Sequence, residues 1–215
     1  MSATGDGRPI GVLGLQGDFE AHRRAFEEIG VPARVVRFAG ELAAISGLVI
    51  PGGESTTLIK LMLDVGFIEP LRLFHAEGRP LFGTCAGAIL LAAKVTNPDQ
   101  FSLGLIDIDI ERNAYGRQVE SFETARGRVE EPLDSSPFGL PGDSMDLVLI
   151  RAPRIRRYGP QVRVLVRHVP ASGDPEPVLV RQGNVLAGTF HPELGPERRI
   201  HGYFARMARL DAVAA

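Results

Sequence analysis

The clearest candidate for chemistry in this 215-residue chain is its single cysteine, Cys85. It lies at the centre of residues 83–87, Gly-Thr-Cys-Ala-Gly. The apolar residues 81–82 predict a strand before it, and residues 86–94 predict a helix after it. Small residues on both sides of the cysteine allow a sharp strand-to-helix turn, which lifts the side chain out at the end of the sheet. A helix N-terminus favours the thiolate, so we interpret Cys85 as a nucleophile rather than a buried apolar residue.

A cysteine nucleophile needs a base, and the base needs a group that orients it. His191 follows an apolar strand predicted for residues 185–190, and Pro192 ends the hydrogen bonding of that strand. Glu193 lies two residues further on and faces the same way in an extended chain. The carboxylate can therefore fix one tautomer of His191 while the other ring nitrogen faces the thiol.

The other four histidines are assigned no catalytic role. His22 and His75 fall in predicted helices, where each is most simply a surface or helix-packing residue. His168 falls in a predicted strand and His201 in the last predicted helix.

A glycine pair marks a third feature, residues 51–57, Pro-Gly-Gly-Glu-Ser-Thr-Thr, between a predicted strand and a predicted helix. Glycines permit unusual backbone angles and close approach, and their N–H groups can point at a developing oxyanion. The alternative is an ordinary turn with Ser55 or Thr56 as the N-cap. A phosphate-binding loop is disfavoured, because the G-x-x-x-x-G-K-[ST] pattern is missing here.

The elements that must position these residues follow an α/β pattern. Short apolar runs alternate with amphipathic segments, which predicts a three-layer, doubly wound, mostly parallel sheet. In the first half we predict strands at 10–15, 34–38, 48–50 and 81–82, and helices at 18–29, 55–65, 68–77 and 86–94. In the second half we predict further short strands at 105–110, 147–150, 162–166, 178–180 and 185–190, with antiparallel strands among them. A surface loop is predicted at 130–143 and a last helix at 198–210.

Length and composition limit the possible classes of protein. We expect a flexible N-terminal tail at residues 1–9 and a single domain at residues 10–215. One cysteine cannot form an internal disulfide, which fits a reducing, cytoplasmic location. The net charge of −2 argues against nucleic acid as a partner, and no apolar run approaches the ~20 residues that cross a membrane. No metal or cofactor is expected.

Taken together in this order, the glycine loop, the Cys85 turn and the His-Pro-Glu ending resemble the class I, or triad, glutamine amidotransferases. Further motifs make the chain similar to one family among them, the glutaminase subunits of pyridoxal 5′-phosphate synthase. These motifs are Gly-Val-Leu-Gly-Leu-Gln-Gly at 11–17, the loop at 51–57, Glu-Arg-Asn with Tyr-Gly-Arg-Gln-Val and Ser-Phe-Glu at 111–123, and Ile-Arg-Ala-Pro at 150–153. The resemblance covers nearly the whole chain after Arg8, with lengthened stretches around 137–146 and 171–176.

The resemblance implies a flavodoxin-like fold and a reaction. L-glutamine is hydrolysed through a cysteine thioester, and the ammonia passes to a separate synthase subunit within a large hetero-oligomer. Cys85 would be the nucleophile, His191 the acid and base, and Glu193 the residue that orients His191. The implied glutamine-binding residues are Gly52, Gly53, Glu54, Arg112, Ile150 and Arg151, and the implied oxyanion donors are the N–H groups of Gly53 and Ala86. Gln16 would lie near the oxyanion loop.

Two other readings remain open from the sequence. The chain could be an enzyme of the same fold with another role, such as a glutaminase subunit that feeds a different acceptor. It could also be a non-enzymatic partner subunit that kept the fold. The residues between 112 and 123 argue against the first reading, and the intact Cys85, His191 and Glu193 argue against the second.

Overall fold

The parallel half of a large mixed sheet forms the centre of the molecule. A computed structural model of the chain describes residues 7–114, 122–130, 142–170 and 173–210. The parallel strands are, in spatial order, β2 (Ala33–Val36), β1 (Ile10–Leu13), β3 (Leu48–Ile50), β4 (Leu81–Thr84) and β12 (Val185–Gly188). This order is that of flavodoxin-like sheets, in which ligands bind beyond the carboxyl ends of the strands.

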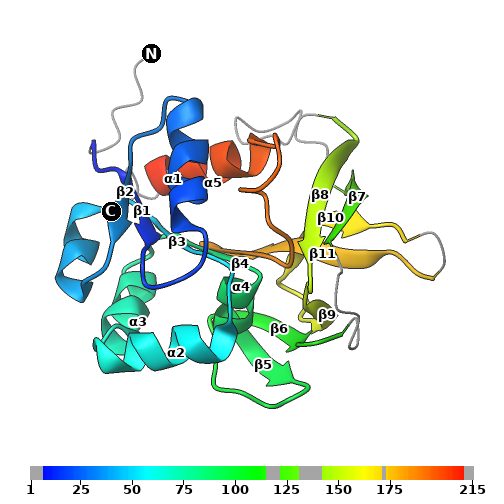
Figure 1. The fold of residues 1–215 in the computed structure, drawn as a ribbon, viewed down its shortest axis with the longest axis horizontal. Helices are drawn as coiled ribbons and strands as arrows, with labels where there is room; N and C mark the ends of the chain where they lie inside the picture. The colour runs from blue at the N-terminus through cyan, green and yellow to red at the C-terminus, as the bar shows by residue number, and fades with distance from the viewer. Residues whose placement is uncertain (1–6, 115–121, 131–141, 171–172, 211–215) are drawn as a thin grey trace.

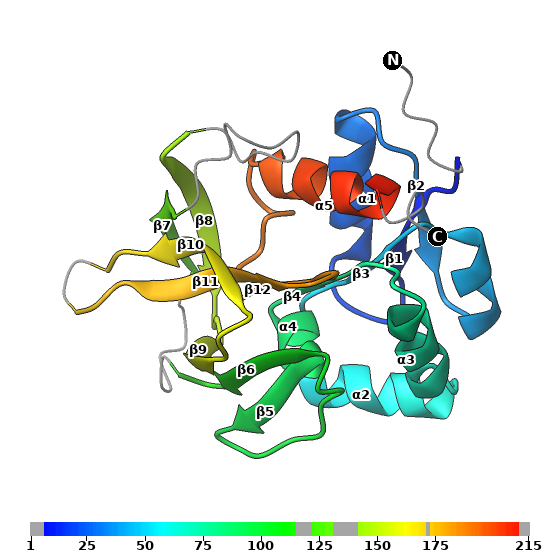
Figure 2. The ribbon, with the colours of Figure 1, turned by 180° about the vertical axis from the view of Figure 1, so that it is seen from behind.

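Helices cover both faces of this sheet, which makes the three layers that the sequence predicts (Figure 1). On one face lie α1 (Phe19–Glu28) and α5 (Arg199–Leu210), and on the other lie α2 (Ser55–Asp64), α3 (Ile68–Ala76) and α4 (Ala86–Leu91) (Figures 1 and 2). A short 3₁₀ helix, η1 (Ala39–Ala44), joins β2 to β3. Asp18 is the N-cap of α1, where its side chain accepts a hydrogen bond from the N–H of Ala21.

Two buried apolar clusters fill the spaces between the layers. Phe26 of α1 and Phe204 of α5 pack with Phe82 of β4 on one face. Leu58 of α2 and Phe74 of α3 belong to the cluster on the other face. Because successive residues of a strand point to opposite faces, each buried strand contributes to both clusters and reads as a continuous apolar run.

The second half of the chain extends the same sheet with antiparallel strands. After β12 the order continues through β11 (Glu176–Gln182), β10 (Arg163–His168), β7 (Phe122–Val129) and β8 (Ser144–Ile150). A separate three-stranded sheet is formed by β5 (Ala92–Thr96), β6 (Ile106–Glu111) and β9 (Arg154–Tyr158) (Figure 2). The α/β class and the antiparallel addition predicted from the sequence are confirmed.

The helix predicted at residues 86–94 is wrong in its last three residues. The helix ends at Leu91, and residues 92–96 form β5. The carbonyls that would continue the helix accept hydrogen bonds from a distant segment: Leu90 from the N–H of Leu103, and Leu91 from that of Leu105. Tertiary pairing therefore overrides the helix propensity of this alanine- and leucine-rich run.

Several other expectations meet the structure only in part. The strands β7 and β9 and the helix η1 were not predicted. Most of the loop expected at 130–143, and parts of the tail at 1–9 and of the motif at 111–123, lie outside the described residues. Among the residues that the structure does describe, no helix is long and apolar enough to cross a membrane.

Candidate active site

The turn around Cys85 is as sharp as the sequence predicts. Cys85 has φ 47° and ψ −103°, a conformation that is costly for a residue with a side chain. Its N–H donates to the carbonyl of Gly188 at 2.8 Å, which ties the turn to β12. A Cβ on Gly83 would lie 2.5 Å from the carbonyl carbon of Gly87, and a Cβ on Gly87 would collide with the carbonyl of Ile50. Only glycines fit at these two positions.

The side chain of Cys85 follows the end of β4, where the sequence argument places it, but it does not project into bulk solvent. The residue is only 7% exposed. Its side chain instead forms part of the wall of a pocket. A thiol held in this way is accessible to a bound small molecule and shielded from bulk water.

Cys85, His191 and Glu193 are brought together at the ends of β4 and β12. His191 Nδ1 lies 2.8 Å from Glu193 Oε1, and the His191 ring and the Cys85 side chain line the same pocket. The His191 N–H donates to the carbonyl of Val148 at 2.9 Å, which anchors the backbone there. Since Nδ1 faces the carboxylate, Nε2 is the ring nitrogen left for the thiol. The arrangement is that of a nucleophile, a base and an orienting carboxylate.

The electrostatics of His191 and Glu193 favour their charged forms. Burial lowers the pKa of His191, but hydrogen bonds and charge interactions with Cys85 and Glu193 outweigh it and raise the pKa to about 10. Burial raises the pKa of Glu193, but contacts with His22 and His191 bring it below its usual value. At neutral pH we therefore expect an imidazolium beside an ionised carboxylate.

The glycine loop packs directly against the catalytic pair. A Cβ on Gly52 would lie 2.5 Å from His191 Cε1 and 3.2 Å from Cys85 Cβ. Gly53 has φ 138°, which only glycine adopts readily. Ala86 is the first residue of α4, so its N–H has no acceptor within the helix. These positions fit the oxyanion donors inferred from the sequence, whose role stays a prediction.

Residues from both sheets line a pocket of about 200 Å³ beside Cys85. Its lining includes most of the predicted site residues: Gly53, Glu54, Cys85, Arg112, Ile150, Arg151 and His191. The other lining residues, Ser55, Ile89, Asn113 and Pro153, were assigned no role from the sequence. Ser55, Asn113 and Pro153 lie inside the motifs at 51–57, 111–123 and 150–153, and this was the sequence signal that could have identified them. Among the described residues, no three His, Cys, Asp or Glu side chains are placed to hold a metal ion together.

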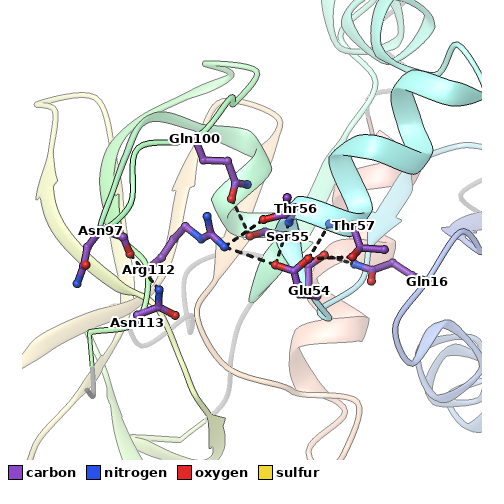
Figure 3. Close-up of polar contacts among 9 residues, drawn as sticks. All are labelled: Gln16, Glu54, Ser55, Thr56, Thr57, Asn97, Gln100, Arg112 and Asn113. Carbon is purple, nitrogen blue, oxygen red and sulfur yellow. Dashed lines mark hydrogen bonds and ion pairs between the residues drawn. The ribbon is translucent and has the colours of Figure 1, made fainter. Parts of the chain in front are cut away.

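Glu54 connects the glycine loop to the far wall of the pocket (Figure 3). Its carboxylate accepts hydrogen bonds from the N–H groups of Thr56 at 3.1 Å and Thr57 at 2.7 Å, so Glu54, and not Ser55 or Thr56, is the N-cap of α2. Arg112 Nη2 lies 3.5 Å from Glu54 Oε1 and 3.4 Å from Thr56 Oγ1. Burial raises the pKa of Glu54, but these backbone hydrogen bonds lower it by more. The carboxylate is therefore ionised beside the guanidinium.

Gln16 approaches the same loop from the opposite side (Figure 3). Its Nε2 donates to the backbone carbonyl of Glu54 at 2.8 Å. A Cβ on Gly53 would lie only 2.9 Å from the same nitrogen. The expected position of Gln16 near the loop is confirmed, and its side chain restrains the backbone there.

His22 is the residue whose position the sequence analysis missed. It is fully buried, and its Nε2 lies 3.3 Å from Glu193 Oε2. A signal was present, because Ala25 and Phe26 follow at the spacing of the buried face of α1. A histidine on that face has to find polar partners.

Known proteins resemble this chain over nearly its whole length. Residues 12–210 match the SNO glutamine amidotransferase family. The pyridoxal 5′-phosphate synthase subunit PdxT of Koribacter versatilis is 52% identical over 200 residues, covering 93% of this chain and 95% of that protein. PdxT of Corynebacterium jeikeium is 48% identical over 206 residues, covering 95% and 98%.

Solved structures agree with these matches. The crystal structure of a glutamine amidotransferase, 45% identical, superimposes with a TM-score of 0.79 and covers 93% of this chain and 98% of that one. PurLQS from Thermotoga maritima, at 18% identity and a TM-score of 0.67, covers 96% and 98% and shares the fold. Sequence and structure lead to the same assignment: the chain belongs to the SNO glutamine amidotransferase family.

Proposed function

We propose that this chain hydrolyses L-glutamine to L-glutamate and ammonia, and that it supplies the ammonia to a synthase subunit that makes pyridoxal 5′-phosphate. One observation carries the proposal: Cys85 and His191 line one pocket suited to a small molecule, and His191 Nδ1 pairs with Glu193 Oε1 at 2.8 Å behind it. The names of the PdxT relatives, about half identical to this chain, support the choice of acceptor pathway.

The first half of the reaction uses Cys85 as the nucleophile and His191 as the acid. The Cys85 thiolate attacks the side-chain carbonyl carbon of glutamine, and the carbonyl oxygen becomes an oxyanion. The N–H groups of Gly53 and Ala86 stabilise that charge. His191, as an imidazolium, donates its Nε2 proton to the departing nitrogen, so that ammonia leaves and a γ-glutamyl thioester remains on Cys85.

The second half uses His191 in the opposite sense. The ring is now neutral, and it accepts a proton from a water molecule that attacks the thioester. The C–S bond breaks, glutamate leaves, and His191 and Cys85 return to the imidazolium and thiolate. Glu193 keeps the Nδ1 proton in place throughout and stabilises the positive charge.

The polar end of glutamine matches the charges on the far wall of the pocket. Arg112 offers a guanidinium whose fork suits the α-carboxylate, and Glu54 beside it offers a carboxylate for the α-ammonium group. Ile150 and Arg151 complete this wall, and Arg151 has the unusual φ of 42°. We infer that residues 10–215 act as one glutamine amidotransferase domain, because both sheets contribute to a single pocket.

The synthase partner is also expected to control the reaction. A Gly-Gly peptide can take two orientations at low steric cost, and only one of them turns an N–H group toward the oxyanion. A partner that binds that orientation more tightly shifts the population toward it. Loss of one oxyanion donor typically costs about 10²- to 10³-fold in rate, so this change alone could gate the enzyme.

The test is a glutaminase assay of the purified chain with and without its cognate synthase subunit. We expect slow ammonia release from the chain alone, faster release with the synthase, and pyridoxal 5′-phosphate formation from a pentose phosphate and a triose phosphate. Ammonia release without formation of pyridoxal 5′-phosphate would indicate that the ammonia has a different acceptor. No ammonia under either condition would indicate a non-enzymatic partner subunit.

A further inference from the structure

Behind the catalytic carboxylate lies a second histidine that the reaction scheme does not use. His22 Nε2 is 3.3 Å from Glu193 Oε2, while the other carboxylate oxygen, Oε1, pairs with His191 Nδ1 at 2.8 Å. His22 is fully buried in α1 and lies edge-on to Phe82, with the ring centroids 6.3 Å apart. Helix α1 and the segment after β12 therefore each contact one oxygen of Glu193.

Two further polar partners surround the His22 ring. Its Nδ1 lies 3.0 Å from Nε2 of His201, which comes from α5, beside α1 on the same face of the sheet (Figure 2). Its Nε2 also lies 3.2 Å from Oγ1 of Thr84, the residue before the nucleophile. Thr84 and His201 are fully buried as well. This group of side chains has no route to bulk water and depends on its own hydrogen bonds.

The surroundings decide which nitrogen of His22 carries the proton. Burial lowers the pKa of His22 and His201, and it outweighs the attraction of Asp18 and Glu193 for a positive charge on His22. His22 is therefore neutral at neutral pH and has one N–H. Facing an ionised Glu193, that N–H is most stable on Nε2, and Nδ1 then accepts a hydrogen bond from His201 Nε2.

We propose that His22 is a positioning residue for catalysis: its Nε2–H faces Glu193 Oε2 and keeps Oε1 directed at His191, and His201 fixes the tautomer that this requires. The inference rests on the proposed glutaminase reaction. It adds to the triad a connection from α1 and α5 to the base, through side chains that do not touch the substrate.

The need for such a residue is greatest after the first proton transfer. Before it, Glu193 faces a positively charged His191. Once His191 has protonated the leaving nitrogen, the carboxylate is buried beside a neutral ring. Among the described residues, Glu193 Oε2 has no aligned hydrogen bond, and the nitrogen that faces it, at 3.3 Å, is His22 Nε2. The Nε2–H of His22 is then the donor available to stabilise the buried charge.

The experiment compares two substitutions of His22 in the full chain assembled with its synthase. His22→Leu fills much of the space without a donor, whereas the amide nitrogen of His22→Gln reaches the position of Nε2. We expect His22→Leu to lower kcat by about 10- to 150-fold with little change in KM, as for the loss of a hydrogen bond to a charged group. His22→Gln should recover most of that loss.

A second measurement follows His191 directly, by NMR titration of the ring in the free chain. We expect the midpoint to move to lower pH in His22→Leu and to return toward the wild-type value in His22→Gln. This readout needs no glutamine. An inactive wild type would therefore contradict the proposed function and still leave the positioning role testable.

The matched control is His168→Leu, which removes another buried histidine, from β10 and outside the pocket. It should leave kcat unchanged. The positioning role is overturned if folded His22→Leu keeps the wild-type kcat and His191 titration. It is also overturned if His22→Gln, at equal thermal stability, loses as much as His22→Leu, or if His168→Leu has the same effect on kcat.

Discussion

The two walls of the active-site pocket are built by different parts of the fold. Cys85 and His191 follow β4 and β12, neighbouring parallel strands in the middle of the main sheet. Arg112 follows β6 of the small sheet, and Ile150 and Arg151 come at the end of β8, the last strand of the antiparallel extension. The first wall would carry out bond breaking, and the second would hold the amino-acid end of glutamine.

Packing also differs between the two walls. On the catalytic wall, the backbones of Gly83 and Gly87 approach so closely that neither position accepts a side chain, and Gly52 lies against His191. On the substrate wall, Arg112 reaches the rest of the site through a 3.5 Å contact with Glu54, a carboxylate that is 55% exposed. We therefore expect changes to the catalytic wall to abolish the reaction and changes to the substrate wall to weaken binding.

The largest effect is expected from Cys85→Ala. Removing the nucleophile should lower kcat by at least about 10⁴-fold, because the members of a triad act as a unit. The thermal midpoint should stay close to that of the wild type, since alanine adopts the same backbone and the thiol lines a pocket. Ammonia release is measured with the synthase present. Comparable rates of ammonia release by the wild type and Cys85→Ala would show that Cys85 is not the nucleophile.

Glu193→Gln should be the next most damaging change on this wall. We expect a loss in kcat of about 10²- to 10⁴-fold, which is smaller than that of His191→Asn, because orienting a base contributes less than being one. The pH profile carries a second expectation. Glu193 raises the pKa of His191, so the alkaline limb of kcat/KM, near pH 10 in the wild type, should move to lower pH in the variant.

The direction in which the alkaline limb of kcat/KM moves in Glu193→Gln is the control for this prediction. Loss of a negative charge beside a cation lowers the pKa of the cation, so an alkaline limb that moves upward would contradict the assigned pair. A fully active Glu193→Gln would exclude Glu193 from the site.

On the substrate wall, Arg112→Ala should raise KM for glutamine by about 10- to 150-fold and change kcat less. A clamp on the α-carboxylate, far from the reacting amide, contributes mostly uniform binding. Steady-state kinetics separate the two constants. Arg156→Ala is the matched control, because Arg156 forms an exposed ion pair with Glu111 in the same small sheet and should matter little. An unchanged KM in Arg112→Ala would show that another residue binds the α-carboxylate of glutamine.

The same two walls differ in how far the sequence could predict them. The parallel strands read clearly as short apolar runs, and the small residues around Cys85 and the His-x-Glu spacing after a strand led directly to the catalytic wall. The small sheet was harder. Residues 86–94 favour a helix, and the contacts from residues 103–105 together with pairing to β6 turn the last part into β5. Most of β9 is charged and solvent-exposed, so its strand pattern is weak.

Specific partners of individual side chains account for the remaining differences between prediction and structure. His22 looked like an ordinary helix residue, because its partners, Glu193 and His201, lie near the other end of the chain. The alternative considered for the glycine loop had Ser55 or Thr56 as the N-cap of the helix, on residue preference. Glu54 takes that position because its longer side chain curls back to the N–H groups of Thr56 and Thr57. Residue-type preferences describe one residue at a time, whereas the roles of His22 and Glu54 depend on the residues with which they interact.

The smallest effect is expected at Glu54, where the two walls meet. Glu54→Ala removes the N-cap of α2 and the carboxylate beside Arg112, so it should lower the free energy of unfolding by about 0.5–2 kcal/mol and raise KM several-fold. Glu54→Asn should restore the cap without restoring the charge. Because the folded state lowers the pKa of Glu54 below its usual 4.5, its extra stability is present above that pH and fades as the pH falls through the folded value. Denaturant unfolding at pH 7 and pH 3 measures both effects. If the stability difference between wild type and Glu54→Ala does not shrink at the lower pH, the ionised carboxylate is not what holds the walls together.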